Sequence, residues 1–341
     1  MNLLGLRPLQ ATWASAPLGL PISLIIHRAA LICFVDANDV RIFCDIAFRD
    51  LSYNAMTQRH VSSLEIGRKL GLDEKTVRVR VKQMEDAGFI KYYQAMPSLA
   101  LLGFRSVSLY RFEAMNLATK NKVLQAVHKV PHAVEAFDYI GPVVAVDIAG
   151  ATTHDVRGTA DGIAGRFELK EQSLGERAVR DPHVTLDRMD WQLIQRLRYD
   201  ARGTTKDVAK SLTITPRMAE YRINKLLDSG ALLIRAVINT QKQAGLIFYE
   251  LEVSMEESKR ATVVQRLREE HGEKLWSVSS PAPGLVLASL FGFTLGEPEE
   301  SAIAALTVDG VKYCSLLMLK EVIEPRSPNW VDRLIEEKLA S

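Results

Sequence analysis

Apolar residues recur at intervals of three and four along residues 62–88, which is the spacing of one face of a helix. A first short helix is expected to end at Gly71, because glycine readily adopts the left-handed conformation that closes a helix. Asp73 is suited to cap a second helix. The buried face of that second helix is expected to comprise Val77, Val81 and Met84. A polar strand follows, so the segment predicts a helix-turn-helix followed by a wing.

Basic side chains lie between these apolar positions. Arg78, Arg80 and Lys82 cannot all share the buried face, so positive charge must face outward. A short basic helix supported by a smaller helix is suited to enter the major groove of DNA. An amphipathic helix with a solvated basic face has the same pattern, so this segment alone leaves both interpretations open.

The chain repeats this pattern once. With one constant offset and no gap, Arg222 aligns with Arg80 and Gly230 aligns with Gly88. The first copy carries about nine extra residues before its helix-turn-helix, an insertion that a loop tolerates at little cost. The repetition favours DNA binding over a chance basic surface.

Each helix-turn-helix is followed by a region with the order strand, helix, strand, strand, helix, strand. In the second copy Tyr249, Leu251 and Val253 alternate with Glu250 and Glu252, which predicts a half-buried strand. In the first copy, strands are expected near 105–112, 134–139 and 143–148 and from about 167, and helices near 123–127 and from about 155. In the second copy, the other strands are expected near 285–291 and 311–319, and the helices near 261–267 and 299–306. A Pro-rich turn is expected at 280–284. This order is the ferredoxin-like arrangement. The expected fold class is α+β, with two winged helix-turn-helix domains alternating with two ferredoxin-like βαββαβ domains.

The chain resembles the leucine-responsive regulator (Lrp/AsnC) family of prokaryotic transcription factors, in which a winged helix-turn-helix precedes a βαββαβ module called RAM. Residues 186–202 are similar to the family's opening helix and residues 215–226 to its recognition helix. The doubled architecture departs from the family's usual single copy. The expected domains are an N-terminal extension (1–34), winged helix-turn-helix 1 (35–102), RAM-like domain 1 (103–176), a linker (177–184), winged helix-turn-helix 2 (185–243), RAM-like domain 2 (244–325) and a C-terminal helix (326–341).

The resemblance implies a sequence-specific transcriptional regulator with double-stranded DNA as its partner. The expected DNA-binding residues of the first copy are Lys75, Thr76, Arg78, Val79 and Lys82, and those of the second copy are Thr215, Arg217, Glu220, Tyr221 and Lys225. Arg80 and Arg222 occupy an arginine position shared by both copies, and either a structural or a phosphate-facing role is open to them.

The resemblance also implies that RAM modules pair through their sheets and bind an amino acid near the turn between the middle strands. Here those turns, at 140–143 and 280–284, lack the acidic residues typical of the family. An effector's ammonium would have no carboxylate partner there, which weakens the case for an amino-acid effector. A homo-oligomer is expected, although two fused copies could build the usual pair within one chain.

The chain of 341 residues is 47% hydrophobic and 25% charged, the balance of a soluble globular protein with several cores. A net charge of +2 requires any DNA affinity to come from local patches. The apolar run at 18–26 contains Pro21 and is followed by His27 and Arg28, so we expect no membrane span there but either a packed extra helix or an overextended start site. The C-terminal residues 327–341 predict either a docked terminal helix or a partner-binding tail.

No short catalytic motif appears in the sequence, and Cys33, Cys44 and Cys314 lack the spacing of a metal site or a disulfide framework. We therefore expect a cytoplasmic protein that is not an enzyme, without catalytic residues, cofactor or metal. Two alternatives remain. Siroheme-type tetrapyrrole decarboxylases resemble the same architecture, but they would need clusters of Arg and His in the RAM-like halves. A protein-binding winged-helix scaffold would not need basic residues on the two helices.

Overall fold

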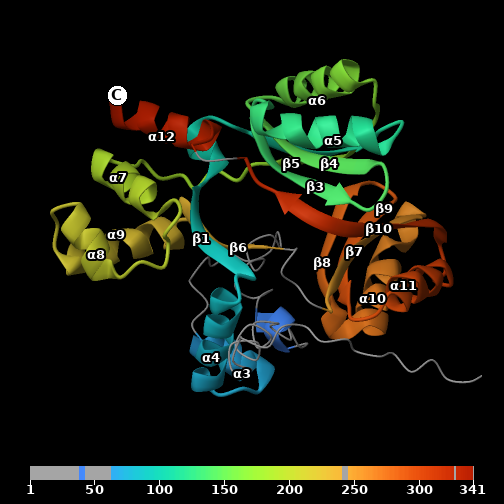
Figure 1. The fold of residues 1–341 in the computed structure, drawn as a ribbon, viewed down its shortest axis with the longest axis horizontal. Helices are drawn as coiled ribbons and strands as arrows, with labels where there is room; N and C mark the ends of the chain where they lie inside the picture. The colour runs from blue at the N-terminus through green and yellow to red at the C-terminus, as the bar shows by residue number, and fades with distance from the viewer. Residues whose placement is uncertain (1–37, 43–62, 240–244, 326–327, 341) are drawn as a thin grey trace, which may run out of the picture.

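The computed structural model describes residues 38–42, 63–239, 245–325 and 328–340. Two helix-turn-helix modules lie beside an antiparallel sheet that two ferredoxin-like halves share (Figure 1). The N-terminal extension and the insertion near 51–60 lie outside the described residues. None of the helices in the described ranges combines the length and apolarity that a transmembrane span requires.

The first helix-turn-helix contains a helical stretch at 38–42, α3 (Ser63–Leu70) and α4 (Glu74–Asp86). The carboxylate of Asp73 accepts a 2.8 Å hydrogen bond from the Thr76 N–H and so caps α4. Val77, Val81 and Met84 are buried, as their spacing predicts. Gly71 has the positive φ of +68° that the turn requires.

The second helix-turn-helix contains α7 (Arg188–Leu197), α8 (Thr205–Ser211) and α9 (Pro216–Asp228). Asp187 and Asp190 form a reciprocal capping box at the start of α7. Thr215 caps α9, and Pro216 occupies its first turn, where no backbone N–H donor is needed. The two modules thus share their geometry but use different capping residues.

The strand after each recognition helix pairs with its counterpart in the other copy. β1 (Ile90–Pro97) runs antiparallel to β6 (Leu232–Ile238), and together they form a two-stranded ribbon. The sequence predicts a separate polar wing after α4, but β1 is mostly buried. The Arg198 guanidinium donates to the Ala95 carbonyl at 2.7 Å, so the second module also holds this strand. The ribbon therefore joins the two helix-turn-helix modules.

The larger sheet has eight strands in the order β5-β2-β4-β3-β10-β7-β9-β8. Its strands are β2 (Ser106–Glu113), β3 (Ala133–Tyr139), β4 (Val143–Gly150), β5 (Lys170–Ala178), β7 (Ile247–Met255), β8 (Leu275–Ala282), β9 (Leu285–Gly292) and β10 (Val311–Ile323). Helices α5 (Leu117–Ala126) and α6 (Thr153–Phe167) cover the first half, and α10 (Arg260–His271) and α11 (Gly296–Leu306) cover the second. Short 3-10 helices lie at Leu99–Leu102, Val127–Lys129, Glu257–Lys259 and Gly272–Lys274.

The two halves meet at two seams. β3 pairs with the end of β10, which is why β10 runs beyond the expected Leu319 to Ile323. At the opposite edges β5 approaches β8 so closely that a Cβ on Gly175 would lie 1.8 Å from the Pro281 carbonyl oxygen. The Pro-rich segment expected to be a turn is mostly strand, since β8 continues to Ala282. The sheet therefore curls around an interior that both halves line.

The C-terminal helix α12 (Trp330–Ala340) is docked in the structure. Trp330, Val331 and Ile335 are buried in the core shared with the helix-turn-helix modules. The Trp330 indole donates to the Ala133 carbonyl at 2.7 Å, and Asp332 accepts from Arg198 of the second module at 2.8 Å. The docked interpretation is therefore confirmed, because the apolar side of the helix is already used within the chain.

Candidate nucleic-acid interface

The exposed residues of α4 include Lys75, Arg78, Val79 and Lys82, and Gln83 and Asp86 are exposed beside them toward the end of the helix. Val79 retains 48% of its surface although it is apolar. Arg78 lies 3.7 Å from Glu74 and Lys82 lies 3.0 Å from Asp86, both as solvent-exposed pairs one helical turn apart. Such pairs contribute little to stability, so the cations can exchange these partners for phosphate at small cost.

Thr76 differs from these neighbours, because it belongs to the cap. Its N–H and its hydroxyl both donate to the Asp73 carboxylate, at 2.8 and 2.5 Å. These two hydrogen bonds lower the pKa of Asp73. Thr76 therefore fixes the start of α4, and its hydroxyl is already engaged.

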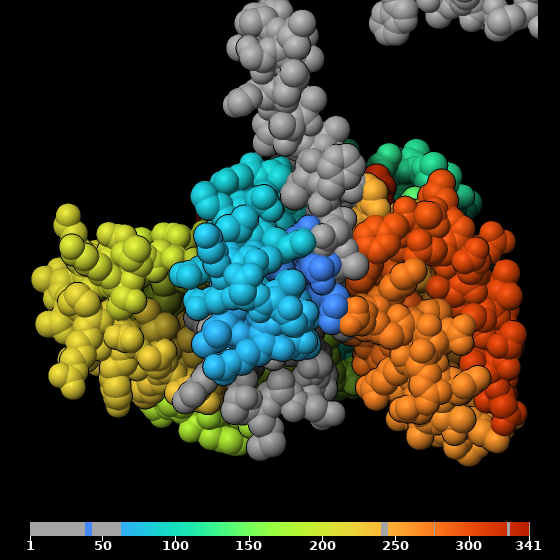
Figure 2. Space-filling model, turned by 90° about the horizontal axis from the view of Figure 1, so that it is seen from below, coloured from blue at the N-terminus to red at the C-terminus, as the bar shows by residue number. Residues whose placement is uncertain are grey.

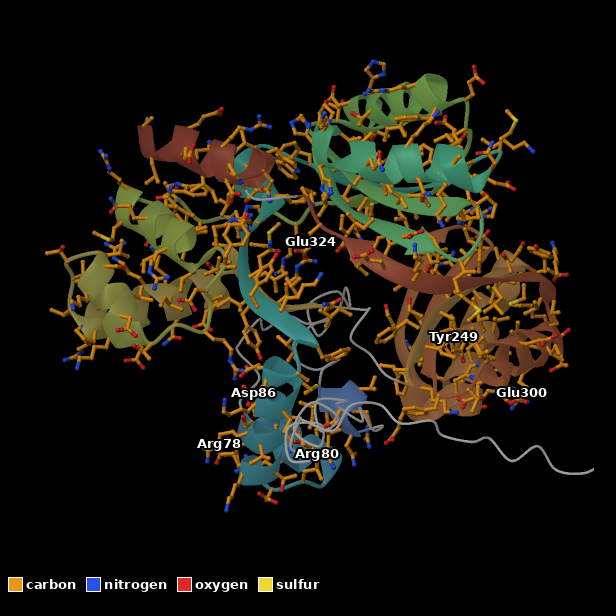
Figure 3. All side chains as sticks on the ribbon, in the orientation of Figure 1. Arg78, Arg80, Asp86, Tyr249, Glu300 and Glu324 are labelled. Atoms are coloured by element: carbon orange, nitrogen blue, oxygen red, sulfur yellow. The ribbon has the colours of Figure 1, made fainter. Side chains whose placement is uncertain are left out.

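Arg80 and Arg222 lie away from the outer surfaces. Arg80 donates to Asp39 of the preceding helical stretch at 2.9 Å, and Figure 3 shows it on the opposite side of α4 from Arg78. Arg222 donates to Asp187 at 2.8 Å and to Asp190 at 2.6 Å. Of the two roles open to this arginine, the geometry favours the structural one, since it ties the recognition helix to the opening helix.

The outer surface of α9 contains Arg217, Glu220 and Tyr221, as expected, and Tyr221 retains 67% of its surface. Met218 and Asn224 are exposed beside them and are not among the residues expected from the sequence. Their spacing from Tyr221, three residues before and three after it, is the signal that places them on the same helix face.

Two other residues expected on this surface have partners within the chain. The Thr215 hydroxyl accepts from the Met218 N–H at 3.2 Å as the cap of α9. The Lys225 ammonium lies 3.5 Å from the buried Asp190 carboxylate. In the described part of the chain, Arg217 is the cation of α9 that has no ion pair.

Figure 2 shows the first helix-turn-helix exposed between the second module and the second ferredoxin-like half. Its recognition helix is therefore accessible on one face of the molecule. The second module lies at one end, where α8 and α9 face outward (Figure 1).

The middle-strand turns of the ferredoxin-like halves are occupied by the chain's own groups. Lys120 donates to the carbonyl oxygens of Tyr139 and Gly141, and its ammonium lies 2.5 Å from Asp138. In the second half, the Glu257 carboxylate accepts from the Gly284 N–H at 2.6 Å. A free ammonium would have to compete with Lys120 at the first turn.

Residues 58–91 match a model of the winged helix-turn-helix DNA-binding class. The proline dehydrogenase transcriptional activator of Rhodobacter capsulatus is 32% identical over 125 residues, which cover 34% of this chain and 74% of the activator.

Among solved structures, the siroheme decarboxylase NirDL superposes with a TM-score of 0.50 at 15% identity, covering 89% of this chain and 98% of its own. The E. coli protein AsnC superposes with a TM-score of 0.35 at 12% identity, covering 43% and 99%. The similarity to NirDL extends to the fold only. The match to the activator has a higher sequence identity than the match to NirDL, 32% against 15%, and it covers 74% of the activator. The chain therefore belongs to the family of winged helix-turn-helix transcriptional regulators that includes this activator.

Proposed function

We propose that this protein is a sequence-specific DNA-binding regulator of the Lrp/AsnC type, with α4 and α9 as its recognition helices. The observation that carries the proposal is the outer surface of α4, where Lys75, Arg78 and Lys82 are exposed around an uncovered Val79. Lysine and arginine at such positions pair with phosphates, and an arginine can also bind guanine through two hydrogen bonds. The apolar Val79 is suited to contact a thymine methyl group.

The second recognition helix would read a different sequence. It presents Arg217, Glu220 and Tyr221 on its outer surface. Glutamate can accept a hydrogen bond from the cytosine amino group but repels phosphate. We therefore propose that α9 contributes more to base selection than to phosphate affinity.

One chain would supply both halves of a binding site. The two copies belong to one continuous chain, and the β3–β10 seam and the β1–β6 ribbon also join them by antiparallel strand pairing. If the recognition helices enter successive major grooves, the operator contains two unlike half-sites about 34 Å apart. A homo-oligomer of such chains would bind several of these asymmetric sites.

The decarboxylase alternative requires a site for a polyanionic tetrapyrrole. The cavity between the ferredoxin-like halves has four carboxylates in its wall, Glu135, Asp147, Glu176 and Glu250, against two guanidinium groups, Arg177 and Arg235. Both guanidinium groups already bind carboxylates. This charge balance opposes the binding of a polyanion and so disfavours the decarboxylase alternative. A scaffold that binds only protein gives no reason for the exposed cations of α4.

The test begins with selection of bound fragments from genomic DNA by the purified full chain. Fluorescence anisotropy on a selected duplex then compares the wild type with R78A and with the control R157A. Arg157 of α6 forms the same kind of exposed pair, 4.0 Å from Asp161, on a surface remote from α4. We expect R78A to weaken binding several-fold and R157A to leave it unchanged.

Equal affinity of the wild type for every duplex and for heparin would contradict sequence-specific regulation. Footprinting tests the arrangement. An asymmetric footprint that loses one half in R78A supports the single-chain site, whereas a palindromic footprint at a stoichiometry of one chain contradicts it.

A further inference from the structure

A cavity of about 570 Å³ lies between the inner faces of the two ferredoxin-like halves. This volume is within the range of sites for small organic ligands. Leu109 and Phe137 line it from the first half, and Leu287 and Leu319 line it from the second. The wall is therefore largely apolar, with a few charged groups set into it.

Two of these charged groups lie directly opposite each other on adjacent strands. Glu135 of β3 is paired in register with Asp147 of β4, an arrangement that is unfavourable for like charges unless cations lie nearby. Arg235 from the ribbon binds Glu135 at 3.1 Å, and Arg177 from β5 binds one oxygen of Asp147. The chain therefore balances each of these two carboxylates with one guanidinium.

Asp147 still has an unused acceptor. The residue is only 3% exposed, and its Oδ1 atom has no hydrogen-bond partner among the residues that the structure describes, whereas Oδ2 accepts from Arg177. Burial raises the pKa of Asp147 despite the neighbouring Arg177. A buried carboxylate oxygen without a donor is costly, so a donor supplied from the cavity would stabilise it.

Glu250 adds a second acidic group from the other half. It accepts hydrogen bonds from the Tyr139 hydroxyl and, at 3.2 Å, from the Ser289 hydroxyl, but no cation pairs with it in the described part of the chain. Burial raises the pKa of Glu250, and the nearby charges of Glu252 and Asp147 act in the same direction. The described residues also contain no group of three or more His, Cys, Asp or Glu side chains placed to hold a metal ion.

We propose that this cavity binds an organic cation, a small molecule with an ammonium or guanidinium group that donates to Asp147 and Glu250. Its apolar body packs against Leu109, Phe137 and Leu287. The two carboxylates come from different halves of the sheet, so the ligand bridges the halves. The site lies on the inner sheet faces, and it is separate from the first middle-strand turn, where Lys120 already supplies an ammonium.

The cavity also touches the ribbon that joins the helix-turn-helix modules. Arg235 of β6 lines the cavity, and its guanidinium contacts Glu135, Gln94 of β1 at 3.2 Å and Glu324 at 2.6 Å. Figure 3 shows Glu324 close to the ribbon, at the end of β10. A cation bound at Asp147 lies near Glu135, which is opposite Asp147 on the adjacent strand. It competes with Arg235 for Glu135 and so changes the contacts that hold the ribbon. This regulatory step rests on the proposed function, whereas ligand binding itself does not.

Calorimetry on the full chain tests the site without DNA. The probes are phenethylamine, tryptamine, agmatine and putrescine, with 2-phenylethanol as the uncharged counterpart of phenethylamine. We expect at least one amine to bind, and its affinity to fall about tenfold in D147N and in E250Q, since each removes one charged acceptor. The control D161N removes an exposed carboxylate of α6 and is expected to bind as the wild type does.

The proposal is overturned if none of the four amines binds, or if 2-phenylethanol binds as well as phenethylamine. That comparison uses only the wild type, so it holds even if a cavity variant fails to fold. Binding of an iron-uroporphyrin in this cavity would also overturn it. Anisotropy with the selected duplex, with and without the bound amine, then tests the coupling: an unchanged DNA affinity refutes the coupling but not the site.

Discussion

The two recognition helices share an internal framework but differ on their outer surfaces. Each begins at a capped residue, and each has an arginine that binds an aspartate of its opening helix, Arg80 in α4 and Arg222 in α9. On the outer surface, however, Arg78 corresponds to Glu220, and Lys82 corresponds to Asn224. The framework that presents the helix is thus kept in both copies, while the charge offered to DNA is not. This difference is the basis of the proposal that α4 supplies affinity and α9 supplies discrimination.

The largest effect is expected from breaking the shared framework at Asp190. Its carboxylate is fully buried against Arg222 and Lys225, so D190A takes the carboxylate partner from Lys225 and leaves Arg222 with Asp187 alone. We expect the free energy of unfolding to fall by about 3–5 kcal/mol, measured by urea denaturation. D39A removes the matched partner of Arg80 and is expected to cost less. An equal loss in both variants would show that the two frameworks contribute alike.

Exchange of charge between the outer surfaces tests the division of roles. R78E replaces the cation of α4 by glutamate, the residue that α9 has at the corresponding position 220. We expect DNA affinity to fall roughly tenfold, about 1.4 kcal/mol. E220R makes the reverse change, and we expect it to raise affinity while weakening discrimination between duplexes. Anisotropy at a fixed salt concentration measures both. A greater loss in R217A than in R78A would instead identify α9 as the source of affinity.

A smaller effect is expected in the salt dependence. Each phosphate contact that is removed lowers the slope of log K against log salt by about 0.9. K82A should show this change, because the Lys82 ammonium pairs with Asp86 and both side chains are exposed to solvent. K225A should change the slope less, because Lys225 lies against the buried Asp190. Equal changes in the two slopes would mean that Lys225 leaves Asp190 to bind DNA.

The smallest effect is expected from acid, and it applies to one helix only. The hydrogen bonds from Thr76 lower the pKa of Asp73, so its capping contribution is complete above about pH 4 and is lost as the pH falls through the lowered folded value. The cap of α9 is Thr215, which does not titrate. D73N should therefore differ from the wild type at neutral pH and match it in strong acid. T215A should cost about 1 kcal/mol at either pH. Chemical denaturation over this pH range measures both.

The contacts of the inner faces of the ferredoxin-like halves could not be predicted from the sequence. The alternation of Tyr249 with Glu250 correctly predicts β7 and its helix-covered face. It predicts only that Glu250 lies on the other face, and the structure shows that this face meets the other half rather than solvent. The acidic wall of the cavity likewise leaves no local pattern in the sequence, because its carboxylates come from four separate strands.

The sequence by itself determined the local elements and both helix-turn-helix modules. It also predicted that Lys75, Arg78, Val79 and Lys82 are exposed on α4, whereas Thr76, expected with them, belongs to the cap. These follow from spacing, capping residues and glycines, which act over a few neighbouring positions. Only the tertiary structure decided that β1 pairs with β6, that β3 pairs with β10, and that Arg80 and Arg222 face inward. Strand pairing and ion pairing join residues far apart in the chain, and periodicity carries no information about which distant partner a polar face will meet.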